Sequence, residues 1–346
     1  MKLKIFNRIA GIAVLLAAIN TAGFSKQVSY ADNQSNAVAD NNLKTEGSKP
    51  DNFDGLSKTV SKSYPADASD VLIIKNMFGT VTVNTWDKSE FKVDVQIKVT
   101  SPDEATEKRY LDNIIIKNNK TGNEVYFETV IEPTEGKNKM NIDYTIYMPS
   151  KNALSIKNEF GVITLPDMQG KMDIMSMFGG LTAKSLPNPD NIIHIQNGSI
   201  ISTIEYLKAT DLNVEFSKLE LNNADQLHAN INFGNTTIRH ITTSARISVS
   251  HGSSFEMEGI DKNVRSLNIH SSFTNIKLTF NDDFNGEYDV NAINGNFKYS
   301  KSNSRGPAPE SRSGWNNSHS YAGPIGKGDP DRLVNVNSSF GNVVFD

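Results

Sequence analysis

Apolar and polar residues alternate in short runs on both sides of a recurring Phe-Gly pair. Two clear copies are LSIKNEFGVITL at 154–165 and MDIMSMFGGLTA at 172–183. Alternation with a period of two is typical of a half-buried β-strand, whose side chains point to opposite faces in turn. Each copy therefore predicts two short strands that meet at a corner.

Ten windows of this kind align on the small residue that follows the corner aromatic. From Gly161 to Gly295, successive windows are 17 to 22 residues apart. A short and nearly fixed period predicts stacked coils, because one coil cannot bury its apolar face alone. The ten small residues are Gly79, Gly161, Gly179, Gly198, Ser217, Gly234, Gly252, Thr274, Gly295 and Gly341.

The columns of this alignment indicate which side chains face the core. The residue five places before the small residue is apolar in every window, and the residue two places after it, such as Ile163 or Ile200, is mostly apolar. The residue directly before it is Phe in seven windows and Asn197, His251 or Asn294 in the others. Asn-Gly and His-Gly pairs tolerate positive φ, so we expect a corner that is either plugged by Phe or turned by a polar residue.

These patterns predict an all-β protein: a single-stranded right-handed parallel β-helix, or solenoid, preceded by an antiparallel β region. Right-handedness follows from the crossover rule for parallel strands. A left-handed helix is the competing geometry, but its six-residue apolar period does not match the columns found here.

Two segments interrupt the repeat. Residues 66–149 contain longer alternating runs and one helix candidate at 102–113, and they predict an antiparallel cap over the first coil. Residues 150–346 carry the repeats, with a Gly-, Ser- and Pro-rich loop excursion at about 300–333. The final strand at Phe345–Asp346 is expected to be an exposed edge or to be covered by that excursion.

The first 31 residues predict a secretory signal peptide. Lys2, Lys4 and Arg8 precede an apolar run from Ile9 to Ile19 that is too short to span a bilayer. Cleavage is expected after Ala31, with a cut near Ala22 or an uncleaved anchor as alternatives. Residues 32–65 are polar and without periodicity, which predicts a disordered tether. No other stretch predicts a membrane-spanning segment after signal cleavage.

Composition narrows the functional classes. Residues 1–31 carry four basic and no acidic residues, so their removal changes the formal net charge from −4 to −8. An acidic chain disfavours nucleic acid as a partner. The chain has no cysteine, so no disulfide can support the core. No phosphate-binding loop is present, no ligand spacing is found for His194, His228, His240 and His319, and no cofactor is expected.

The recurrent corners NMFG (76–79), NEFG (158–161), SMFG (176–179) and SSFG (338–341) resemble those of the DUF4097-type β-strand repeat family. The resemblance covers roughly residues 66–346. Proteins of this family are described as adhesins and are typical of the Bacteroidetes cell envelope. The resemblance implies a repeat architecture and an envelope location, and it brings no catalytic residues.

Five residues are candidates for a site. Trp315 and Tyr321 lie in the excursion, where aromatic side chains can contact a sugar or a protein, or merely hold the loop against the solenoid. His251 and Glu256 occupy columns that are otherwise aromatic or apolar, and with His270 they could form a polar or metal site. The alternative is a bulge, in which Phe255 and Met257 restore the alternation.

The sequence therefore predicts an exported, non-catalytic binding, adhesin-like or scaffold protein in the periplasm or at the cell surface. Its expected partners are extended ligands, either cell-surface glycans or envelope proteins. One alternative is a carbohydrate-active enzyme, although the acidic residues form no recurring pair of the kind that glycoside hydrolysis uses. Another is a structural component of an envelope-stress or transport assembly.

Overall fold

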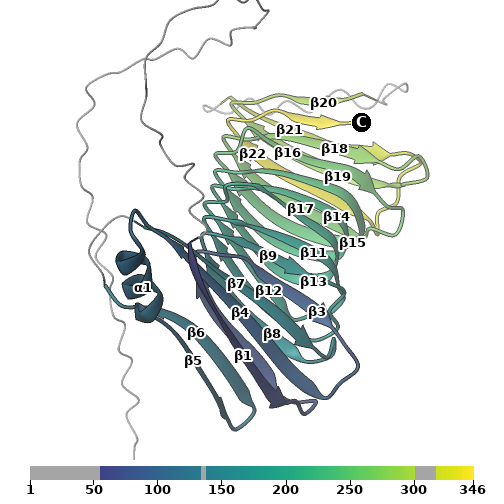
Figure 1. Ribbon diagram of the computed structural model, residues 1–346. Coiled ribbons are helices and arrows are strands. Elements are labelled where there is room, and N and C mark those ends of the chain that lie inside the picture. The colour runs from purple at the N-terminus through teal and green to yellow at the C-terminus, as the bar shows by residue number, and fades with distance from the viewer. Residues whose placement is uncertain (1–54, 134–137, 301–316) are drawn as a thin grey trace, which may run out of the picture. The chain divides into compact units, whose positions relative to one another are not determined.

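The protein is all-β, as predicted. This computed structural model describes residues 55–133, 138–300 and 317–346. They form one hydrogen-bonded sheet of 23 strands and one helix, α1 (Glu104–Asn113) (Figure 1). Within those ranges no helix is long and apolar enough to cross a membrane. The expected signal peptide and residues 32–54 of the expected tether lie outside the described residues, whereas residues 56–65, which were expected to be disordered, form a strand.

The repeated windows lie side by side in two parallel ladders. Residues before each corner form the first ladder, in which Ile74 pairs with Ile156 and Ile156 with Ile174. The apolar column five residues before the corner is thus a continuous line of contacts in the core. In spatial order the first ladder contains β2 (Val71–Met77), β8 (Ala153–Glu159), β10 (Met172–Met177), β12 (Asn191–Gln196), β13 (Ile201–Glu215), β14 (Lys218–Asn232), β15 (Asn235–Ser250), β17 (Ser266–Ser272), β22 (Leu333–Ser339) and β19 (Gly286–Ile293).

Residues after each corner form the second ladder, in which Val81 pairs with Ile163. The long strands β13, β14 and β15 run through both ladders. The second ladder contains β3 (Val81–Thr85), β9 (Val162–Leu165), β11 (Gly180–Leu186), the first halves of β13, β14 and β15, β16 (Ser254–Ile260), β18 (Asn275–Phe280), β23 (Val343–Phe345) and β20 (Phe297–Tyr299).

A mixed region lies against the first coil, which is formed by β2 and β3. Its strands are β1 (Leu56–Pro65), β4 (Glu90–Thr100), β5 (Ile114–Thr121), β6 (Glu124–Ile131) and β7 (Lys139–Met148). β1, β4 and β7 pair antiparallel, as do β5 and β6, whereas β6 and β7 pair parallel with β2 and β3 of the first coil. The apolar edge of the first coil is therefore covered. α1 begins at Asp103, whose side chain accepts a hydrogen bond from the backbone N–H of Thr106.

The C-terminal copy of the repeat does not stack last. β22 pairs on one side with β17 and on the other with β19, and β23 pairs with β18 and β20, so the final copy lies between two earlier ones (Figure 1). Both expectations for the last strand were wrong: Phe345 is fully buried, and a strand covers each side of β23. The end of the stack is instead covered by β21 (Ser318–Ile325), which pairs antiparallel with β19 inside the expected excursion.

Two coils contain insertions after the corner. Ile200 was expected in the core, but it is 44% exposed, and Ser202 occupies the buried place opposite Leu219. Two residues are therefore inserted after Gly198. One residue is inserted after Gly252, so that Phe255 and not Ser254 pairs with Ile276. This confirms the bulge alternative for that strand.

At five corners the residue three places before the small residue is a buried Asn or Ser, and four of these five side chains hold a carbonyl group at or beside a corner. Ser176, Ser271 and Ser338 each donate a hydrogen bond at 3.1 Å within their own coil, to the carbonyl groups of Gly180, Thr274 and Gly341 respectively. Asn158 donates instead to the carbonyl of Gly79 in the neighbouring coil at 3.0 Å. The motif therefore satisfies buried carbonyl groups where the chain bends and the ladder is interrupted.

A buried polar network joins the cap to the first two coils. The Thr129 hydroxyl donates to Asn76 Oδ1 and lies 2.9 Å from the Tyr144 hydroxyl. Asn76 Nδ2 donates to the carbonyl of Ile142 and to Asn158 Oδ1. All four polar side chains are less than 10% exposed, so each bond replaces contacts with water that folding removes.

Alkaline pH should destabilise the protein through Tyr144. Burial raises the pKa of its phenol from 10.0 to about 12. Between pH 10 and 12 the unfolded chain loses this proton while the folded chain keeps it. The contribution of Tyr144 to the free energy of unfolding is therefore fully present below pH 10, and it falls by about 1.4 kcal/mol per pH unit between pH 10 and 12. Urea unfolding at several pH values should give a slope that is shallower by this amount in Tyr144→Phe, while the remaining slope includes Tyr206, whose pKa is also raised to about 12. An equal slope in both proteins would contradict this assignment.

Candidate functional site

Every corner places one residue in the left-handed backbone region. φ is between 49° and 62° at seven Phe residues, and it is also positive at Asn197, His251 and Asn294. The glycine that follows has no positive φ in any window. The residue with left-handed backbone is therefore the one before the glycine. The glycine is not needed here for its ability to adopt positive φ.

The corner Phe side chains point outward. The expectation that Phe plugs the corner was wrong, because the seven side chains are 36–55% exposed. Neighbouring rings stack with centroids 4.6–5.2 Å apart and planes within 17° of parallel, close to the spacing of adjacent strands. We call this row the aromatic ladder; its members are Phe78, Phe160, Phe178, Phe216, Phe233, His251, Phe273 and Phe340.

The fold does not need phenylalanine at these places. A bulky residue at positive φ is strained by about 1–3 kcal/mol, whereas Asn adopts this conformation readily. Asn197 and Asn294 hold the same corner at φ 51° and 52°. Stacking offsets part of the strain in Phe, but half of each ring stays in water. Repeated, strained and exposed aromatic residues are typical of a contact surface.

A groove of about 430 Å³ runs beside part of the ladder. Its lining includes Phe216, Phe233 and His251 of the ladder and the small corner residues Gly198, Ser217, Gly234 and Gly252. Both insertions contribute to the lining, one through Ile200 and Ile201 and the other through Ser253. Lys218 is the one permanently charged residue of the lining, which contains no carboxylate.

The structure separates His251, Glu256 and His270. His251 is a member of the aromatic ladder, stacked between Phe233 and Phe273. Glu256 lies in β16 opposite Lys277, and His270 lies in β17 opposite Ser248, so the three residues are at a corner and in two different ladders. Among the described residues, no group of three or more His, Asp or Glu is arranged to hold a metal ion.

Tyr321 lies in β21, where it is half-buried against the end of the core. Its ring is 5.2 Å from that of Phe297, and its backbone pairs with Val290. Tyr321 therefore contacts β20 through its ring and β19 through its backbone. Trp315 lies outside the described residues.

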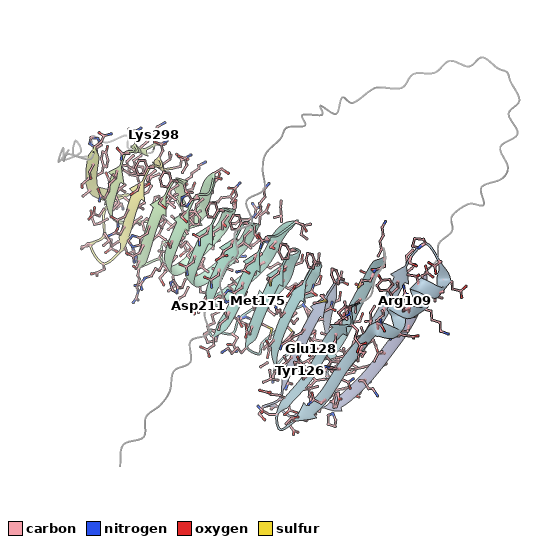
Figure 2. The ribbon with its side chains drawn as sticks, turned by 90° about the vertical axis from the view of Figure 1, so that its left-hand side faces the viewer. Arg109, Tyr126, Glu128, Met175, Asp211 and Lys298 are labelled. Atoms are coloured by element: carbon pink, nitrogen blue, oxygen red, sulfur yellow. The ribbon has the colours of Figure 1, made fainter. Side chains whose placement is uncertain are left out.

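A second concavity of about 660 Å³ lies where β13, β14 and β15 pass between the ladders. Its charged residues include Asp190 and Asp211, both exposed, and Figure 2 shows Asp211 on the outside of the strand stack. Asp211 is 3.0 Å from Nδ1 of His228. A glycosidase acid is shielded from water. Asp190 and Asp211 are exposed to water, so this concavity does not provide a shielded acid of that kind.

Comparisons with known proteins establish no family. No protein-family model and no curated protein matches the chain. A "putative adhesin" structure from Parabacteroides distasonis is 10% identical, with 85% of this chain and 98% of that chain covered and a TM-score of 0.40. A "putative adhesin" from Parabacteroides merdae is 9% identical, with 84% and 96% covered and a TM-score of 0.34. A "putative lipid binding protein" from Parabacteroides distasonis is 10% identical, with 84% and 98% covered and a TM-score of 0.33. With every TM-score below 0.5, these likenesses carry no argument about this chain.

Proposed function

We propose that this protein is an exported, non-catalytic binding protein of the cell envelope, adhesin-like, and that the aromatic ladder is its contact surface. The observation that carries the proposal is the row of strained, half-exposed Phe residues where Asn would suffice. A contiguous apolar strip of this kind is typical of an interaction site. The right-handed β-helix, the DUF4097-type membership and the location in the periplasm or at the surface are parts of this proposal.

The ladder suits an extended ligand, either a glycan or a protein segment. Its contacts repeat along a line, once per coil, so a long ligand gains many small contacts in parallel. Within a stack each ring covers the face of the next and presents its edge to solvent. The unstacked faces of Phe178 and Phe216 are turned toward Asn197, where the ladder is interrupted. There a flat ring of the ligand could stack.

The test replaces Phe by the residue that the chain itself uses at the same corner. In Phe216→Asn/Phe233→Asn/Phe273→Asn we expect binding to isolated envelope fractions to fall at least about tenfold, equivalent to 1.4 kcal/mol. The midpoint of thermal unfolding should change little, because Asn relieves the strain while the stacking is lost. Binding is measured by passing increasing concentrations of envelope extract over the surface-immobilised protein.

Ile115→Thr is the matched control, since Ile115 is 41% exposed on β5 and lies outside the ladder. Its binding should equal that of the unaltered protein. Binding that survives the triple change would overturn the proposal. A large loss of thermal stability with binding retained would assign the ladder to structure alone.

A further inference from the structure

The aromatic ladder contains a run of rings that reads the same from both ends. In spatial order the corners are Asn197, Phe216, Phe233, His251, Phe273, Phe340 and Asn294. The symmetry exists in space and not along the chain, where Asn294 precedes Phe340. It arises because β22 lies between β17 and β19. His251 is the centre of the run.

A run that reads the same in both directions is self-complementary about a two-fold axis, because each ring then lies opposite a ring of the same kind in the other copy. In such an isologous interface residue i contacts residue j, and j contacts i. The ring centroids are 4.6, 4.8, 5.1 and 4.7 Å apart along the run. A partner that contacts every ring must repeat at this spacing, and a second copy of the same run does so by construction.

We propose that the run from Phe216 to Phe340 binds a second copy of this chain, antiparallel, about a two-fold axis at His251. Phe216 then lies opposite Phe340 of the other copy, and Phe233 lies opposite Phe273. The two His251 side chains meet at the axis. This inference rests on the proposed function, because it names a partner for the same ladder.

The flanks of the run are compatible with this pairing. Of the ten residues that directly flank the run, only Glu215 and Lys218 are charged, and both belong to the Phe216 coil. The antiparallel arrangement places Glu215 opposite Ser339 and Lys218 opposite Asn342, so no like charges meet. Few charges around an aromatic centre are typical of a protein interface. The flanking residues are Glu215, Asn232, Ser250, Ser272 and Ser339 on the first ladder and Lys218, Asn235, Ser254, Asn275 and Asn342 on the second.

The contact is small, so the association should be weak and reversible. The four Phe side chains of the run are 50–55% exposed. A fully buried Phe covers about 150–250 Å², so the exposed halves amount to roughly 400 Å² per copy. The total for two copies, about 800 Å², is below the size of a stable interface. Many copies held on one surface would gain from avidity what a single pair lacks.

Sedimentation equilibrium of the purified chain from micromolar to millimolar concentration tests the pairing. We expect the weight-average mass to rise from monomer toward dimer in the unaltered protein and to stay at monomer in Phe233→Asn/Phe273→Asn. His251→Phe places an apolar ring at the axis, so it should self-associate at about tenfold lower concentration. His251→Lys places two like charges there and should abolish the dimer. Ile115→Thr lies outside the aromatic ladder and should retain the dimer.

The outcomes separate this inference from the proposed function. A protein that stays monomeric at every concentration, while the triple Phe→Asn variant still loses envelope binding, overturns the pairing and leaves the proposed function standing. Self-association that survives Phe233→Asn/Phe273→Asn and His251→Lys places the interface elsewhere and also overturns it. If the Phe233/Phe273 variant does not reach the native thermal midpoint, Phe216→Asn/Phe340→Asn gives the same test at the outer pair.

Discussion

Gly161→Ala is expected to lower the free energy of unfolding by roughly 3–5 kcal/mol, a large effect for a single methyl group. A Cβ at this position would lie 1.8 Å from the carbonyl oxygen of Gly79 in the neighbouring coil. Neither group can move alone, because ladder hydrogen bonds fix the coil spacing on both sides of the corner. The glycine is therefore required for close approach of two backbones.

Gly198→Ala provides the matched comparison. Gly198 occupies the same place in its coil, but its added Cβ would meet the Ser217 hydroxyl at 3.0 Å, which can shift at the expense of its hydrogen bonds with the Gly198 N–H and the Glu215 carbonyl. We expect a cost of about 1–2 kcal/mol, the size of the hydrogen bonds that the shift disturbs. Urea unfolding of both variants measures the difference. Equal unfolding midpoints would show that the coils at Gly161 can separate without penalty.

Much of the core could be predicted from the sequence, because strand side chains alternate strictly. Once Ile74, Ile156 and Ile174 were aligned, the pleat required that each column face one way, and these residues do pair in register. The prediction of inward-facing residues was wrong where residues are inserted after a corner. Ile200 stands two places after Gly198, where the other windows have an inward-facing residue. Because two residues are inserted, Ser202 occupies the buried position instead, and hydrophobicity alone favoured the wrong residue.

The candidate site was harder to predict, for two physical reasons. A Phe beside a glycine looks like a core residue, and alternation cannot reveal that Phe216 has positive φ and an exposed ring. The order of the coils also depends on which strands pair across a long chain separation. Nothing local to Phe340 indicates that it stacks on Phe273, so the symmetry around His251 appears only in the folded molecule.

Asn76→Ala should lower the free energy of unfolding by roughly 3 kcal/mol, because it removes the centre of the buried network between cap and coils. The Thr129 hydroxyl loses its acceptor, and the carbonyl of Ile142 and Oδ1 of Asn158 each lose a donor. These groups lie where water does not reach, so the lost bonds are not replaced by hydration. A cavity adds to the cost.

Asn230→Ala is the matched control on an outward-facing position. Asn230 is exposed on β14, and its side chain donates to Asn213 Oδ1 at 3.2 Å. Water can replace that bond, so we expect a change within about 0.5 kcal/mol. Thr129→Val should fall between the two, since it removes one hydroxyl and keeps the shape of the side chain. If Asn76→Ala proved as mild as Asn230→Ala, the first coil would not depend on the polar network, and apolar packing of β6 and β7 alone would hold the cap in place.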